Sequence, residues 1–352
     1  MSNKEKILSD SEDSKGSNPM LWASPVLTIL ICWIFHYFGE METKAVITLG
    51  IAIWTALWWI FEAVPIPIAS LLPLSLLPLF GILEPKVVGE KYGHPLVLLL
   101  FGGFLLSKAM EKSGAHKRIA LMMVNACPSG EKFLILGFMI ATAFLSMWIS
   151  NTATTLMMLP MALAVIQGSQ NKKLTIPLLL GIAFAANIGG IGTPIGTPPN
   201  LVMIGAYADL GYPELSFSKW MKFGIPVTII MVVVIWLWLS RGITSSQQIS
   251  LPHPGNWRTA EVRTLLVFGL TALAWITRSE PFGGWKTWLD LPNANDASVA
   301  FIAVIALFCL PSGGNKKEHL LDWKTANQIP WGMLVLVGAG LCLGEAFKQS
   351  GL

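Results

Sequence analysis

Apolar runs long enough to cross a lipid bilayer recur along the whole chain, and they restrict what it can fold into. A helix needs about 20 residues to cross a hydrocarbon core of about 30 Å. Runs approaching or exceeding that length predict spanning or buried helices at 20–38, 45–61, 66–83, 94–110, 133–149, 153–167, 174–192, 217–239, 263–277, 297–311 and 330–347. The expected fold is therefore an all-α polytopic membrane protein.

Composition supports this class and argues against others. The chain is 53% hydrophobic and only 12% charged, whereas soluble domains carry about 25% charged residues. Its net charge of +4 is spread over loops, which gives no support for nucleic-acid binding. The four cysteines are far apart with no CxxC spacing and are expected to be packing thiols. No HExxH motif or aspartate pair lies in the apolar segments, so we do not expect an enzyme.

The Lys and Arg residues of the loops predict the orientation, because multispanning proteins keep positive loops on the cytoplasmic side. We place residues 1–18 inside as a disordered tail and let each segment cross, except the pair 133–167, which enters and leaves from one side. Fifteen Lys and Arg then lie inside and seven outside. The chain is expected to be a multi-pass protein of the inner or plasma membrane with a cytoplasmic amino terminus.

Two segments of the chain resemble each other. Residues 98–114, LLLFGGFLLSKAMEKSG, align with residues 335–351, VLVGAGLCLGEAFKQSG, at an offset of 237. In the topology above they run in opposite directions, which is typical of the inverted repeats of secondary transporters. The same offset predicts a second copy of SNTAT near residue 387, beyond Leu352. Either the second repeat is truncated here or the similarity is accidental.

The segment SNTATT, residues 150–155, places polar side chains between two apolar arms. The second arm, 156–166, has about 11 apolar residues, or about 16 Å of helix, which suits a re-entrant hairpin better than a crossing. Irregular backbone at membrane depth is tolerated only where it lines a cavity or is buried in protein. The tip is thus a candidate binding site; an ordinary polar loop or a helix N-cap at Ser150 or Thr152 is the alternative.

A second irregular element follows at NIGGIGTPIGTPPN, residues 187–200. Its glycines and three prolines predict that the helix unwinds around 193–199, because proline lacks the amide hydrogen that a helix needs. A kinked helix whose glycines allow close packing is the alternative. Unwinding exposes carbonyl oxygens, which suit a hard cation such as Na⁺, and helix starts, which stabilise an anion. Neither element contains Lys or Arg, so a bound anion would need cations to offset its charge.

Four motifs in order resemble the divalent anion:sodium symporters, the INDY-type carriers of solute carrier family 13. They are WWIFEAVPIPIASLLPL at 58–74, FGGFLLSKAMEKSGAHKRIAL at 101–121, SNTAT at 150–154 and IGGIGTPIGTPPN at 188–200. The resemblance implies an inverted-repeat secondary transporter with a re-entrant helical hairpin and broken helices. It also implies homodimers and alternating access, in which the transport part moves as a rigid body.

The same resemblance implies the site residues. Na⁺ would be bound by Ser146, Ser150, Asn151 and Gly196, and the substrate carboxylate by Ser150, Asn151 and Thr152, with Thr197 and Pro198 lining the pocket. The implied function is sodium-coupled transport of a C4-dicarboxylate such as succinate, malate or fumarate. A dicarboxylate exchanger, a sulfate carrier of the same family and an ion channel are the alternatives.

The resemblance also divides the chain into parts. After the tail, residues 19–92 would be scaffold helices of repeat 1, and residues 93–216 its transport part, with the hairpin at 131–168 and the broken helix at 174–208. Residues 217–328 would be a linking helix and the scaffold helices of repeat 2. Residues 329–352 would begin the transport part of repeat 2, and a chain ending there is not expected to transport by itself.

Overall fold

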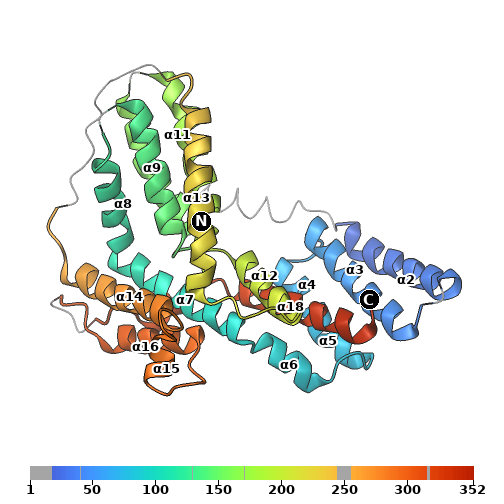
Figure 1. Ribbon diagram of the computed structural model, residues 1–352. Coiled ribbons are helices and arrows are strands. Elements are labelled where there is room, and N and C mark those ends of the chain that lie inside the picture. Colours follow the sequence, from blue (N-terminus) through green and yellow to red (C-terminus); the bar gives the residue numbers. More distant parts are fainter. Residues whose placement is uncertain (1–17, 40, 129, 170, 244–254, 315–317) are drawn as a thin grey trace, which may run out of the picture. The chain divides into compact units, whose positions relative to one another are not determined.

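The computed structural model describes residues 18–39, 41–128, 130–169, 171–243, 255–314 and 318–352, and the predicted tail lies almost wholly outside this range. Within the described residues every regular element is a helix (Figure 1). Seven helical stretches are long and apolar enough to cross a membrane, namely Met20–Phe38, Thr43–Phe61, Pro85–Ser113, Lys172–Gly190, Phe217–Leu239, Thr259–Thr277 and Trp331–Ser350. The expected all-α membrane fold is confirmed.

The described residues form two compact units, one made of those up to His94 together with residues 331–352, the other of those from 95 to 330. The first unit contains α2 (Met20–Phe38), α3 (Thr43–Phe61), α4 (Ile66–Ala69), α5 (Leu71–Leu79), α6 (Pro85–Tyr92) and α18 (Trp331–Ser350). In it α18 packs against α3, α4, α5 and α6. Its glycines allow this: a Cβ at Gly338 would lie 2.5 Å from the Tyr92 ring, and one at Gly332 would lie 2.2 Å from Pro67. The division into scaffold and transport parts stays a prediction.

The prediction of one helix over 66–83 is wrong, because Ser70 separates α4 from α5. Pro73 has no amide hydrogen to donate to the carbonyl of Ala69, one turn before it. The Tyr92 hydroxyl donates to the Ser70 carbonyl over 2.7 Å, and the Ser70 hydroxyl donates to the carbonyl of Ile66 over 2.8 Å. The Ile66 carbonyl also accepts from the Ser70 backbone amide over 3.0 Å, so Ser70 closes α4 with both its backbone and its side chain.

The second unit holds the remaining α-helices and a short 3-10 helix, η1 (Lys172–Leu174). The α-helices are α7 (Pro95–Ser113), α8 (Ala115–Asn125), α9 (Glu131–Ser146), α10 (Asn151–Gly168), α11 (Thr175–Gly190), α12 (Pro198–Asp209), α13 (Phe217–Leu239), α14 (Thr259–Thr277), α15 (Gly284–Trp288), α16 (Asp296–Cys309) and α17 (Trp323–Ala326). Figure 1 shows α9, α11 and α13 side by side, and α9 and α11 each pack against the other and against α13. A buried apolar cluster around Ile135, Phe138, Met158 and Leu178 joins α9, α10 and α11.

The two segments that resemble each other end in the same way. Helix α7 ends at Ser113 and helix α18 at Ser350, and a left-handed glycine follows each, with φ of 79° at Gly114 and 75° at Gly351. Each serine hydroxyl donates to the carbonyl three residues earlier, over 3.1 Å in α7 and 3.2 Å in α18. A glycine at this position ends a helix without the steric cost of a side chain. The sequence similarity is therefore matched by a shared local structure.

Candidate functional site

The tip of the predicted hairpin is the turn between α9 and α10, where residues 147–150 are not helical. Ser150 is the N-cap of α10, because its hydroxyl accepts a hydrogen bond from the Ala153 amide over 3.3 Å. The cap ends the turn and starts the helix at Asn151. The amides of Asn151 and Thr152, in the first two positions of α10, have no acceptor within the helix. They are two donors at the positive end of the helix dipole.

Helix α10 is longer than the apolar arm at 156–166 from which the re-entrant hairpin was predicted. It has 18 residues, from Asn151 to Gly168, and contains Pro160. At 1.5 Å per residue, this is about 27 Å, so length alone does not distinguish a re-entrant arm from a crossing. Neither α9 nor α10 is among the seven stretches that are long and apolar enough to span. The re-entrant hairpin stays a prediction.

The break predicted in the next helix is present. Helix α11 ends at Gly190 and α12 begins at Pro198, which leaves residues 191–197 without helical structure. The break is shorter at its far end than predicted, since Pro198 and Pro199 are the first two residues of α12. Proline is favoured there because the first amides of a helix have no partner to lose.

Asn200 holds the break together from inside. Its side-chain nitrogen donates to the backbone carbonyls of Gly190 and Thr193, over 2.8 Å in both cases. The Asn200 side chain is buried, and its two bonds satisfy one carbonyl at the end of α11 and one within the break. This residue closes the notable NIGGIGTPIGTPPN run, yet its role in stabilising carbonyls could not be read from the sequence.

The break and the hairpin tip lie against each other. A Cβ at Gly190 would meet the Asn151 side-chain oxygen at 2.8 Å and the Thr197 side chain at 3.2 Å. Thr193 donates its hydroxyl to the Met147 carbonyl, which links the break to the tip a second time. Gly196 approaches the Gly190 carbonyl so closely that a Cβ there would lie 2.5 Å from it. Of the predicted site residues, Asn151, Gly196 and Thr197 are thus brought together around Gly190.

Three oxygen atoms meet beneath the tip. The Ser146 hydroxyl, which is fully buried, lies 2.7 Å from the Asn151 side-chain oxygen and 2.7 Å from the Ala186 carbonyl oxygen. A hydroxyl has one hydrogen, so it can donate to only one of these two acceptors at a time. A group of oxygens with too few hydrogens suits a hard cation, which oxygen ligands bind best. Ser146 and Asn151 are among the residues predicted from the sequence, whereas the carbonyl of Ala186, 40 residues after Ser146, is not.

Other predicted residues lie at the edge of this cluster. Thr152 is exposed in the first turn of α10, and Pro198 is half-buried at the start of α12. Among the described residues neither forms a hydrogen bond into the oxygen cluster. Asn187, which the sequence argument did not select, does: the Asn151 side-chain nitrogen donates to the Asn187 side-chain oxygen over 3.2 Å. The sequence signal for this residue was its position, because Asn187 is a polar residue in a largely apolar helix, just before Gly189 and Gly190.

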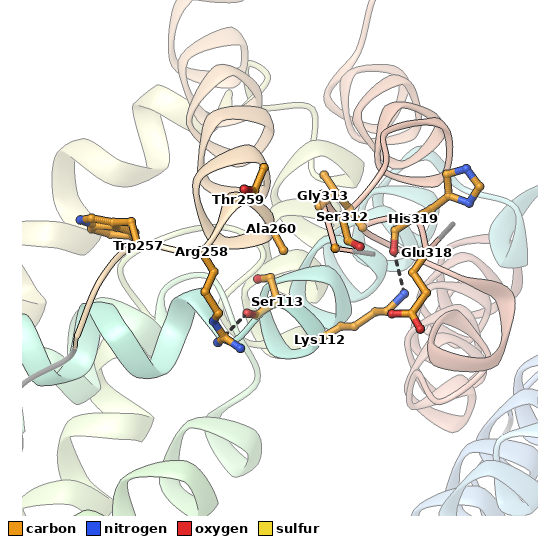
Figure 2. A pocket seen from close by; sticks show the side chains of 12 residues that line it. Lys112, Ser113, Trp257, Arg258, Thr259, Ala260, Ser312, Gly313, Glu318 and His319 are labelled. Carbon is orange, nitrogen blue, oxygen red and sulfur yellow. Dashed lines mark hydrogen bonds between the residues drawn. The ribbon is translucent and has the colours of Figure 1, made fainter. Parts of the chain in front are cut away.

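A polar pocket of about 450 Å³ lies elsewhere in the same unit, lined from α7, the start of α14 and the segment after α16. Figure 2 shows its two cationic side chains turned toward backbone oxygens, Lys112 toward His319 and Arg258 toward Ser113. Lys112 also lies 2.5 Å from an Asp322 carboxylate oxygen, and Arg258 lies 2.8 Å from one of Glu261. The hydrogen bond from Lys112 lowers the pKa of Asp322 to about 2. Since both cations are neutralised, this pocket is a weaker candidate for anion binding than the tip.

Comparisons with known proteins find membrane transporters. The family model described as citrate transporter matches residues 56–352. A protein of Staphylococcus saprophyticus named sodium-dependent dicarboxylate transporter SdcS is 36% identical over 352 residues, covering 93% of this chain and 67% of that protein. The protein of the same name in Staphylococcus aureus strain USA300 is 38% identical over 353 residues, with the same coverage.

Proposed function

The chain belongs to the divalent anion:sodium symporter family, a family of membrane transporters and not of enzymes, and from this premise we propose that it couples Na⁺ to the transport of a C4-dicarboxylate. Succinate, malate and fumarate are the expected class of substrate. The relatives are named for sodium-dependent dicarboxylate transport, which supports both the ion and the anion. Alternating access, with the part that carries the site moving as a rigid body, is the proposed mechanism.

The oxygen cluster under the hairpin tip is the observation that carries the proposal. Ser146 and Asn151 side-chain oxygens, with the Ala186 carbonyl, form a group short of hydrogens inside the protein. We assign Na⁺ to this place, with Ser150 and the backbone at Gly196 completing its ligands. Sodium there would add positive charge to a site whose two elements, residues 146–160 and 187–200, contain no Lys or Arg.

The anion would lie on the open side of the same tip. The free amides at the start of α10 and the side chains of Ser150, Asn151 and Thr152 would bind one carboxylate, with Thr197 and Pro198 lining the pocket. Charge-assisted bonds from amides to an oxyanion are about twice as strong as neutral ones. Because the bound cation offsets the anion's charge, binding of the two ligands is expected to be coupled.

Uptake of labelled succinate into proteoliposomes tests the proposal, with an inward Na⁺ gradient in one arm and choline in the other. Since transport is expected to need both repeats, the assay uses a protein that contains them, and we expect accumulation only with Na⁺ and its loss in Asn151→Ala. Thr277→Ala is the control, since that exposed hydroxyl donates only within its own helix, to the Leu273 carbonyl. Citrate, sulfate and an internal dicarboxylate are added in further arms to test the other substrates and exchange. Leakage of succinate that does not depend on Na⁺ would contradict coupled transport and indicate a channel.

The orientation and the assembly are further parts of the proposal. With the amino terminus in the cytoplasm, Lys172 lies inside and Lys44 outside. In a variant without native cysteines, Lys44→Cys should react with a membrane-impermeant maleimide in intact cells, and Lys172→Cys only after permeabilisation. The opposite labelling would reverse the topology. A homodimer is expected from the family resemblance, and the mass of the purified protein in detergent tests it.

A further inference from the structure

Asn187 stands out because it is an exposed polar side chain on an apolar face. The exposed residues that precede it on the same face of α11 are Ile176, Leu180 and Phe184. Asn187 is the last of this row and lies one turn before the end of the helix. Unlike the three apolar residues, its side chain bonds to the hairpin tip. Its side-chain oxygen accepts from the Asn151 side-chain nitrogen over 3.2 Å, and its own nitrogen donates to the Ala183 carbonyl over 3.1 Å.

The orientation of the Asn151 amide is the property that these bonds control. The oxygen and the nitrogen of a side-chain amide have nearly the same shape, so only their partners decide which atom faces which way. Ser146 cannot decide it, because a hydroxyl can donate to the Asn151 oxygen or accept from the Asn151 nitrogen equally well. With Ser146 as the sole partner, the amide could turn over and remain bonded.

A backbone carbonyl removes this ambiguity. The Ala183 carbonyl can only accept, so it must face the nitrogen of Asn187. The Asn187 oxygen is then left to face Asn151, which must present its nitrogen there and its oxygen to Ser146. The Ala186 carbonyl also can only accept, so in this orientation the Ser146 hydroxyl faces two acceptor oxygens with one hydrogen, a shortage that a cation bound there would relieve. Reversing Asn151 would instead place its oxygen against the Asn187 oxygen and take that oxygen away from the cation.

We propose that Asn187 is a positioning residue that fixes the Asn151 amide with its oxygen toward the cation and its nitrogen toward the anion. This rests on the function proposed above for the hairpin tip and adds a residue to it. An Asn151 amide that turned over would offer a nitrogen to Na⁺ and an oxygen to a carboxylate, so both ligands would bind more weakly. Asn187 thereby raises the affinity for both ligands through Asn151, without binding the cation itself.

Two substitutions separate this role from a merely structural one. Asn187→Leu removes the acceptor that orients Asn151, and should weaken both Na⁺ and succinate. Asn187→Asp keeps an oxygen that accepts from Asn151 but adds a negative charge near the anion. It should therefore leave the Na⁺ affinity unchanged or higher, and weaken succinate by charge repulsion.

The measurement is the thermal unfolding midpoint of the purified full chain, titrated with NaCl against choline chloride and then with succinate at saturating Na⁺. Ligands that bind only the folded state raise this midpoint, so the titrations report affinity without transport. We expect Asn187→Leu to need about tenfold more Na⁺ than the wild type for the same rise in midpoint, equivalent to about 1.4 kcal/mol. We expect Asn187→Asp to keep the wild-type Na⁺ response and to need at least tenfold more succinate. Leu180→Ala, on the same exposed face of α11, should match the wild type in both titrations.

The outcomes distinguish the two proposals. If the wild type responds to Na⁺ and succinate but Asn187→Leu titrates like it, the positioning role is wrong and the proposed function stands. If Asn187→Leu and Asn187→Asp lose both responses equally, Asn187 does not separate cation from anion and the role assigned here is wrong. A wild-type chain that responds to neither ligand overturns the proposed function, and with it this inference. The midpoint in choline alone shows whether each variant is folded.

Discussion

Gly189 of α11 lies directly against the backbone of Ala143 in α9. A Cβ at Gly189 would be 2.3 Å from the Ala143 carbonyl oxygen and 2.5 Å from its Cα. Small residues let two membrane helices approach this closely, where dispersion contacts and backbone interactions stabilise the pair. The same approach brings Ala186, one turn before Gly189, to the Ser146 hydroxyl. The close contact of the two helices therefore builds the oxygen cluster.

Substituting Gly189 by alanine should separate these helices. The added methyl group would overlap backbone atoms that cannot move aside, which destabilises a well-packed protein by about 1–3 kcal/mol. We expect Gly189→Ala to lower the thermal unfolding midpoint and to abolish the Na⁺ response. Gly269→Ala in α14 is the control, since a Cβ there meets nothing within 4 Å, and it should be neutral or slightly stabilising. Equal midpoints for the two variants would contradict the close approach.

Thr193 is expected to hold the break against the hairpin tip. Its side chain is fully buried, and its hydroxyl donates to the Met147 carbonyl. Thr193→Val keeps the shape but leaves that carbonyl without this donor, at a cost of about 1–3 kcal/mol. Unfolding of the variant in detergent measures the cost, and Thr193→Ser should recover most of the stability. A valine variant as stable as the wild type would show that the bond does not hold the two elements together.

The Arg278 ion pairs should be important for the stability of the second unit. Arg278 is 2% exposed, and its Nε lies 2.6 Å from an Asp296 oxygen while another of its nitrogens lies 2.7 Å from Glu214. Removing one partner of a buried pair leaves an uncompensated charge and costs about 3–5 kcal/mol. We expect a loss of this size for Arg278→Met.

A double-mutant cycle separates the pair from its surroundings. With Asp296→Asn in the background, the cost of Arg278→Met should fall, because no buried carboxylate is then left unpaired. Additive effects of the two substitutions would show that the ion pair is not the cause of the loss. Lys222→Met, at an exposed ion pair with Glu280, is the control and should cost less than about 1 kcal/mol.

Acid should weaken the contact between Lys112 and Asp322. The hydrogen bond from Lys112, together with one from the Thr325 amide, lowers the pKa of Asp322 to about 2. A lowered carboxyl pKa contributes stability that is complete above the ordinary pKa of about 4 and is lost as the pH falls toward 2. The wild type should therefore exceed Asp322→Asn in unfolding midpoint at pH 6, and the difference should shrink between pH 5 and pH 2. The exposed carboxylate of Asp290, changed to Asn, is the control; a constant difference for Asp322→Asn would contradict the pairing.

The sequence predicted the elements of the site better than their contacts. Ser150 and the run of glycine and proline after Ile188 have local effects, because a hydroxyl can cap a helix and several prolines and glycines close together interrupt one. The break after α11 is confirmed, as is the alternative in which Ser150 is a helix N-cap, but the turn lies at 147–150 and residues 151–155, predicted as the tip, are the first residues of α10. The split at Ser70 was missed although Pro73 was visible, because an apolar run was judged by its length alone.

The contacts that make the site could not be read in the same way. Ala186 contributes a carbonyl, which every residue has, and it becomes special only because α11 packs against α9. Asn187, in our proposal, positions Asn151 through hydrogen bonds that run from the Ala183 carbonyl to the Asn151 side chain. Both depend on the distance between two helices, which no local pattern encodes.

The two prolines that start α12 make the site unequal on its two sides. Pro198 and Pro199 have no backbone amide hydrogen, and the backbone amide of Asn200 donates to the Thr197 carbonyl over 3.1 Å. The positive end of the α12 dipole can attract an anion, but its first three residues have no hydrogen left to give it. The start of α10, by contrast, keeps its first two amides free for a ligand. A carboxylate bound between the two helices, as proposed, would be attracted by both dipoles but would receive backbone hydrogen bonds only from α10, which would set the direction in which it faces.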